Sequence, residues 1–159
     1  MSLEEEFRSE VRKHLEPLGK ELLVLLPQLI RHEYPNEVVA LAFEVFSDGF
    51  TSGFPVRVFF LDEDNSEFFI YENGEAQYPS PIDPGLLDIE QVYPDELEER
   101  FSSQDEDLDT FTVAGLELVD WFAKCWNQAG GSEFHRIALI GIHDDTKVLD
   151  LKKGVWVGE

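Results

Sequence analysis

The chain has 159 residues, and its 34 aspartates and glutamates outnumber its 12 lysines and arginines, which gives a net charge of −22. The length suits one domain, and a hydrophobic content of 43% supports a core, which excludes a globally disordered chain. The charge excludes nucleic-acid binding through phosphates, because such binding needs clustered cations. No apolar run approaches the ~20 residues of a membrane span, so we expect no membrane association.

The N-terminal region is predicted to be helical. Apolar residues recur at spacings of three and four over residues 7–18, which places them on one face of a helix. The next run, residues 21–26, is apolar on nearly every side, so we expect it to be well buried. Pro27 is expected to disturb the continuity of this second helix, because proline removes a backbone hydrogen bond.

Strands are predicted next, over residues 38–46, 55–61, 67–71 and 75–78. The first two are rich in β-branched and aromatic residues, which favour strands. Asn73-Gly74 predicts a tight hairpin between the last two, because a type I′ turn needs positive φ at both central positions. Together the four strands are predicted to form an antiparallel meander.

Residues 79–110 form a loop-rich, acidic insertion that contains four prolines. Pro94 suits the first turn of a short helix from Asp95 to about Phe101, and residues 102–109 are expected to form an exposed connector. A long amphipathic helix is predicted from about Thr112 to Ala129, ended by two glycines. The C-terminal region then alternates strands and turns, which predicts a hairpin of residues 134–142 and 147–151, followed by a return at 155–157.

This order of elements predicts a single acidic α+β domain over residues 1–159. We expect an antiparallel β-sheet, made of the meander and the C-terminal hairpin, with helices packed on one face.

Cys125 is the only cysteine, so an internal disulfide is excluded and a reducing compartment is favoured. No positively charged segment precedes an apolar run, so no signal peptide is predicted and we expect a cytoplasmic location.

The negative charge is concentrated in the middle of the chain. Residues 51–110 hold 17 acids and two bases, whereas the flanking thirds are much closer to neutral. One interpretation is a solvated, partly mobile loop; the other is a docking surface for a cationic partner. The residues predicted to bind a partner are Asp62, Glu63, Asp64, Asp95, Glu96, Glu98, Glu99, Asp105, Glu106, Asp107, Asp109 and Trp121. Trp121 is included as an interface anchor, although it could instead cover the edge of the sheet.

No motif points to catalysis, and we expect no cofactor and no metal site. The acids that begin at Asp62 depart from a calcium loop, because Glu67 stands where glycine is needed and Asn73 where glutamate is needed. There is no phosphate-binding loop, and Cys125 is interpreted as a buried structural thiol. His135 and His143 with a carboxylate are the best candidates if the protein is a small metal-dependent hydrolase.

The aromatic-rich strands, the tryptophan-bearing helix and the closing hairpin occur together as VVALAFEVF, PVRVFFLDED, FFIYENGE, ELVDWFAKCWNQAGG and HRIALIGIHDDTKVLDL. This pattern resembles small acidic bacterial proteins of the YezG-like immunity type and related families. The resemblance implies a non-enzymatic antitoxin that binds a toxin, often a nuclease. No functional motif matches residue by residue, and residues 79–110 have no counterpart in the family pattern.

Three functions are therefore carried forward. The leading hypothesis is a protein-binding module of the immunity or antitoxin type that neutralises a basic partner. Opposite charges would steer the two proteins together and raise the rate of association. The alternatives are a regulatory or structural subunit that acts through self-association, so that a homo-oligomer is possible, and the hydrolase described above.

Overall fold

A computed structural model describes residues 2–158 and begins with two consecutive helices, α1 (Leu3–Leu15) and α2 (Gly19–Arg31). A 3₁₀ turn, Glu16–Leu18, joins them and contains the first proline of the chain. The helix α2 continues through Pro27 to its end, so the expected break there is wrong. Its buried residues recur along one face, and packing of that face offsets the cost of the missing hydrogen bond.

The main sheet has five strands in the order β2-β1-β5-β6-β7. Their bounds are Ala40–Val45 for β1, Val56–Leu61 for β2, Ile137–Ile142 for β5, Lys147–Asp150 for β6 and Val155–Gly158 for β7. The prediction of a purely antiparallel sheet is wrong at one pair, because β1 and β5 run parallel, with Phe43 opposite Ile140. Parallel neighbours need a long crossover, and a helix of 19 residues lies in the connection that precedes β5.

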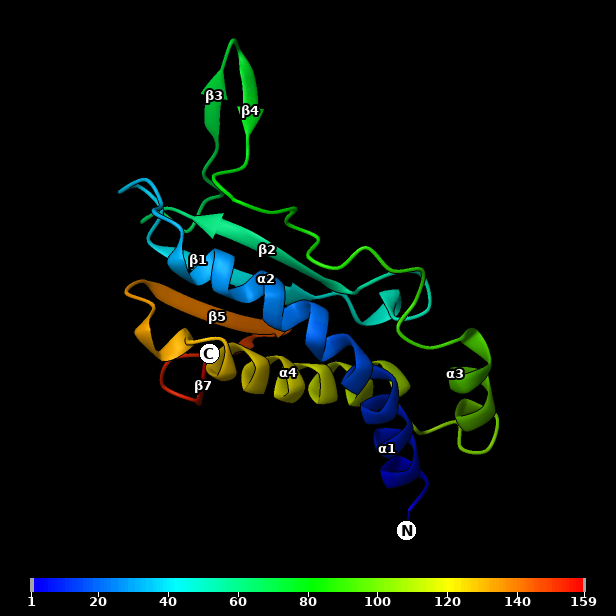
Figure 1. The fold of residues 1–159 in the computed structure, drawn as a ribbon. Coiled ribbons are helices and arrows are strands. Elements are labelled where there is room, and N and C mark those ends of the chain that lie inside the picture. The colour runs from blue at the N-terminus through cyan, green and yellow to red at the C-terminus, as the bar shows by residue number, and fades with distance from the viewer. Residues whose placement is uncertain (1, 159) are drawn as a thin grey trace.

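The predicted four-stranded meander is also wrong. Strands β3 (Ile70–Glu72) and β4 (Glu75–Gln77) form a separate two-stranded sheet, which projects from the body of the molecule (Figure 1). One bridge, between Leu61 and Glu67, connects this region to β2. The hairpin turn itself is confirmed, because Asn73 and Gly74 have φ values of 52° and 82°.

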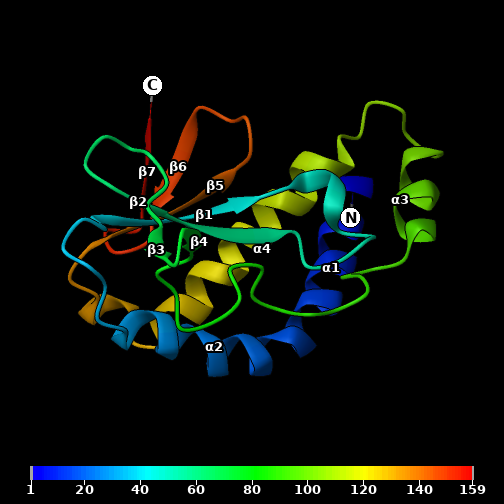
Figure 2. The same ribbon diagram turned by 90° about the horizontal axis from the view of Figure 1, so that it is seen from above.

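Helices cover one face of the five-stranded sheet, as predicted. The long helix α4 (Thr110–Gln128) packs on the sheet, and α1 and α2 pack against α4 (Figure 2). Gly115 allows the close approach of α4, because a side chain there would begin 2.9 Å from the Cδ1 atom of Ile142. The chain is therefore an α+β fold with a helical layer on one side and an open sheet face on the other.

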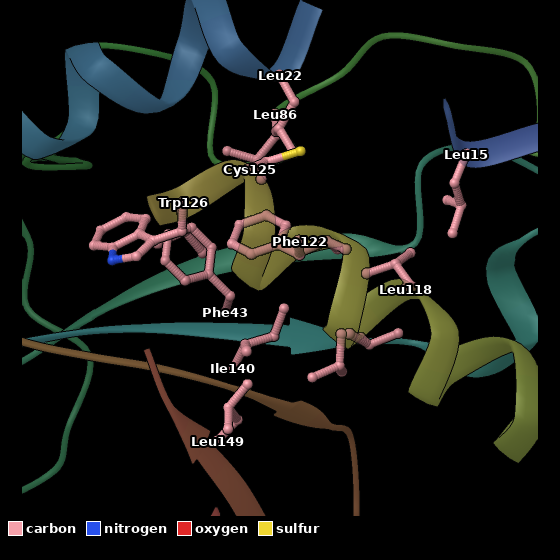
Figure 3. Packing of buried hydrophobic residues seen from close by; sticks show 14 of the residues in the cluster. Leu15, Leu22, Phe43, Leu86, Leu118, Phe122, Cys125, Trp126, Ile140 and Leu149 are labelled. Carbon is pink, nitrogen blue, oxygen red and sulfur yellow. The ribbon is translucent and has the colours of Figure 1, made fainter. Parts of the chain in front are cut away.

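The core lies between α4 and the sheet. Phe43 of β1 packs against Phe122 and Trp126 of α4, with ring centroids 4.8 Å and 5.7 Å apart (Figure 3). The segment before the short helix α3 (Asp95–Ser102) joins this core through Tyr93, which stacks on Phe50. None of the helices formed by residues 2–158 combines the length and apolar character that crossing a membrane requires.

Candidate protein-binding surface

The predicted acidic residues separate into two groups in space. Asp62, Glu63 and Asp64 occupy the turn after β2, whereas the acids of residues 95–109 lie on α3 and in the connector from α3 to α4. Both ribbon views place these two groups at opposite ends of the molecule (Figures 1 and 2). They cannot form one docking surface, so each has to be judged by itself.

In the first group, Asp62 to Asp64, the Asp62 side chain stabilises a local turn. The Asp62 carboxylate accepts hydrogen bonds from the backbone N–H groups of Asp64 and Ser66, at 2.9 Å and 3.0 Å. Asn65 completes the turn with a φ of 63°, a conformation that asparagine tolerates better than most residues. Glu63 and Asp64 are exposed. The conformation of this segment is therefore explained by its own hydrogen bonds.

The second group is presented by an amphipathic helix. Leu97 and Phe101 anchor α3 in the core, where Phe101 packs on Phe7 of α1 at 5.2 Å between ring centroids. The opposite side of the helix carries exposed Asp95, Glu96 and Glu99. Acids in the first turn of a helix also interact favourably with its dipole, which helps to hold them there.

Glu98 belongs to the scaffold of α3. The Tyr93 hydroxyl donates a 2.6 Å hydrogen bond to its carboxylate. Burial raises the pKa of Glu98, the hydrogen bond from Tyr93 opposes that shift, and the charge of Asp95 adds to it. We therefore remove Glu98 from the residues available to a partner.

The connector between α3 and α4 contains acids of two kinds. Asp105 accepts a hydrogen bond from the backbone N–H of Asp107, and Asp109 caps α4 by accepting from the N–H and hydroxyl of Thr112. Glu106 and Asp107 are exposed, and none of the hydrogen bonds formed within residues 2–158 involves their carboxylates. The sequence prediction thus combined structural acids with free ones.

Within residues 2–158, no cation forms an ion pair with the free acids. Arg100 is the single base within residues 95–109, and its guanidinium lies over the Phe101 ring at 4.6 Å from the centroid. None of the ion pairs formed by residues 2–158 involves Asp95, Glu96 or Glu99, or the acids of the connector. The negative potential of this end is therefore open to a partner.

An exposed aromatic residue follows the acids of the connector in the chain. Phe111, in the first turn of α4, is 45% exposed and follows Asp109 by two positions. We use the name acidic surface for the free carboxylates of Asp95, Glu96, Glu99, Glu106 and Asp107 together with Phe111. The sequence analysis missed Phe111 because its spacing to buried residues of α4 matches that of the core; its position directly after the acidic run is the signal that could have identified it.

Trp121 has a different environment from the one expected of an exposed anchor. It is half-buried and packs edge-to-face against Phe54, at 6.2 Å between ring centroids. It also lines a groove between α4 and the first two helices, next to Gly19 and Leu23. The structure does not bring Trp121 together with the acids of α3, which lie at the far end of α4.

The predicted histidine pair does not converge. His135 precedes β5 and His143 follows it, so a strand of six residues, about 20 Å long, separates them. The Nδ1 atom of His143 lies 3.4 Å from Glu44, and its ring packs on Phe46. Burial raises the pKa of the Cys125 thiol, which disfavours the nucleophilic thiolate. Within residues 2–158 no group of three or more histidine, cysteine, aspartate or glutamate side chains could hold a metal ion.

Comparisons with family models, curated proteins and solved structures found no match to the chain. The functional argument therefore starts from the geometry of the acidic surface. Free charge and an exposed aromatic side chain at one end of a well-packed domain form the rim and the anchor of many protein interfaces.

Proposed function

We propose that this protein is a non-enzymatic binding module that docks a basic protein on its acidic surface. The observation that carries the proposal is the group of exposed carboxylates on α3 and the connector, which form no ion pair among residues 2–158 and which the exposed Phe111 follows in the chain. Carboxylates that are not engaged within the chain can pair with lysine or arginine from a partner, and an exposed phenylalanine can fill a pocket in it.

The resemblance to YezG-like immunity proteins supports a more specific form of the proposal. In that form the protein acts in the bacterial cytoplasm and neutralises a basic toxin such as a nuclease. Nucleases carry positive charge where they hold phosphates, so an acidic inhibitor competes for that same surface. Electrostatic steering also makes capture fast, which suits an antitoxin.

The test is capture of basic proteins from a lysate of the source organism, followed by measurement of association rates with the purified partner. We expect Asp95→Asn combined with Glu96→Gln to slow association by about tenfold at low salt. Phe111→Ser should instead speed dissociation, because it removes an apolar contact and leaves the charge unchanged.

Glu63→Gln combined with Asp64→Asn is the matched control, since it removes the same two charges from the opposite end of the molecule. This control should bind as the wild type does. Equal slowing by both double variants would mean that net charge, and not the acidic surface, drives binding. Unchanged rates in both would reject the electrostatic mechanism.

A further inference from the structure

Trp121 lies outside the acidic surface and lines a groove of its own. On α4 it is one turn after Glu117 and one turn before Cys125, so the three side chains share a face of the helix. This face forms one side of the groove, and Gly19 and Leu23 of α2, which runs beside α4, lie on the other (Figure 2). The groove has a volume of about 540 Å³, which suits a small organic ligand.

Gly19 keeps space open in this groove. It is the first residue of α2, it is buried, and its φ of −59° is one that any residue adopts. A Cβ atom at this position would lie 3.7 Å from Nε1 of Trp121, which is an ordinary contact. Neither the backbone nor the packing therefore requires glycine, although glycine loses more conformational entropy than alanine in a helix. What Gly19 provides is unfilled space beside the indole N–H.

The indole N–H of Trp121 is a free donor. None of the hydrogen bonds formed within residues 2–158 involves it, and unlike the unpaired indole N–H of Trp126 it is not fully buried. Arg12 provides a second donor, because its Nε and Nη2 atoms bind Glu117 and leave Nη1 without a partner in the described part of the chain. Since Glu117 and Trp121 are four residues apart on α4, the two donors lie about one helical turn apart.

The charged residues that line the groove balance each other. Two of the lining acids are engaged, because Glu117 binds two arginines and Asp120 pairs with Lys124 at 3.2 Å. The bases are Arg12, Lys20 and Lys124, and the acids are Glu16, Glu117 and Asp120. Within residues 2–158, Glu16 and Lys20 are the one acid and the one base of this set that form no ion pair. A locally neutral groove with free donors, in a chain of −22, favours a ligand that brings acceptors.

We propose that this groove binds a small aromatic carboxylate. The carboxylate accepts hydrogen bonds from Nε1 of Trp121 and Nη1 of Arg12, and the ring lies against Leu23 in the space that Gly19 leaves open. Hydrogen bonds to an ionised acceptor are about twice as strong as those between neutral groups, so the charge of the ligand contributes to its affinity. The inference does not depend on docking of a basic protein at α3.

Proton–nitrogen NMR of the whole chain, titrated with 1-naphthoate, tests the proposal. The chain has three tryptophans, and each gives one indole N–H signal. We expect the Trp121 signal, identified by its loss in Trp121→Phe, to shift and saturate with a Kd of about 1 mM or below, while the signals of Trp126 and Trp156 stay in place. 1-Naphthamide, which has the same shape and no charge, should bind about tenfold more weakly. A Trp121 signal that does not move, equal shifts of all three signals, or equal binding of the amide overturns the proposal.

Gly19→Ala distinguishes a ligand site from a structural role for the glycine. The added methyl group fills the space beside Nε1 of Trp121, so 1-naphthoate should bind about tenfold more weakly. The midpoint of thermal unfolding should stay the same or rise, because alanine favours a helix. Gly49→Ala is the matched control, since Gly49 does not line the groove and a Cβ atom there meets only ordinary contacts, the nearest at 3.5 Å from Pro55. It should bind 1-naphthoate as the wild type does. Unchanged binding by Gly19→Ala, or an equal loss in both variants, contradicts the proposal.

Discussion

At the scale of single residues, Glu117 is the strongest electrostatic contact between α1 and α4. Its buried carboxylate accepts a hydrogen bond from Arg8 at 3.1 Å and two from Arg12 at 2.9 Å and 3.0 Å. Burial acts to raise the pKa of Glu117, but the hydrogen bonds from Arg12 and Arg8 outweigh it and hold the pKa below the ordinary value of 4.5. Removing one partner of such a group leaves the other charges uncompensated.

Glu117→Gln should therefore lower the free energy of unfolding at neutral pH by about 1–3 kcal/mol. Because the folded-state pKa is depressed, the contribution of the carboxylate is fully present above the unfolded-state value. It is lost as the pH falls through the folded-state pKa. Urea unfolding of wild type and variant at neutral pH and below pH 4.5 checks this: the difference in the free energy of unfolding between them should shrink on acidification.

Glu10→Gln is the control. It alters an ion pair with Lys13 on the surface of α1 and should have little effect at either pH. An equal loss for Glu117→Gln at both pH values would show that packing, and not charge, is responsible.

At the scale of elements, the β3–β4 hairpin is separable from the fold. All six residues of its strands are exposed, and the hairpin begins and ends where the Phe69 and Tyr78 rings pack together at 5.4 Å. Replacing residues 70–77 with two glycines should change the free energy of unfolding by less than about 0.5 kcal/mol, since no buried contact is lost. Thermal unfolding measures this, with Phe101→Ala as the contrast, because that change empties a core position and should cost about 3–5 kcal/mol. A large loss on removal of the hairpin would mean that it packs on the body in solution.

The sequence predicted some elements better than others. The difference depends on how far apart in the chain the residues that determine each element lie. The Asn73-Gly74 turn and the helix that begins near Thr112 depend on neighbouring residues, and both are present. The parallel pairing of β1 with β5 joins residues about a hundred positions apart. An alternating apolar pattern predicts a strand but does not determine which other strand pairs with it. The acids of the candidate site were visible in the sequence. Their division into two ends, and the hydrogen bonds that occupy Glu98 and Asp109, depend on the tertiary fold.

At the scale of the whole molecule, exposed acids lie at both ends of a chain of −22, but only the α3 end is proposed to dock a partner. Attraction between opposite charges weakens as salt screens it. Salt should therefore weaken docking of a basic partner on the acidic surface.

The salt dependence separates docking on the acidic surface from an effect of net charge. As the salt concentration is raised, the association rate with a basic partner should fall by about tenfold or more. Asp95→Asn combined with Glu96→Gln should reduce this dependence on salt, whereas Glu63→Gln combined with Asp64→Asn should leave it unchanged. An equal reduction in both double variants would mean that the net charge of the chain, and not the acidic surface, governs association.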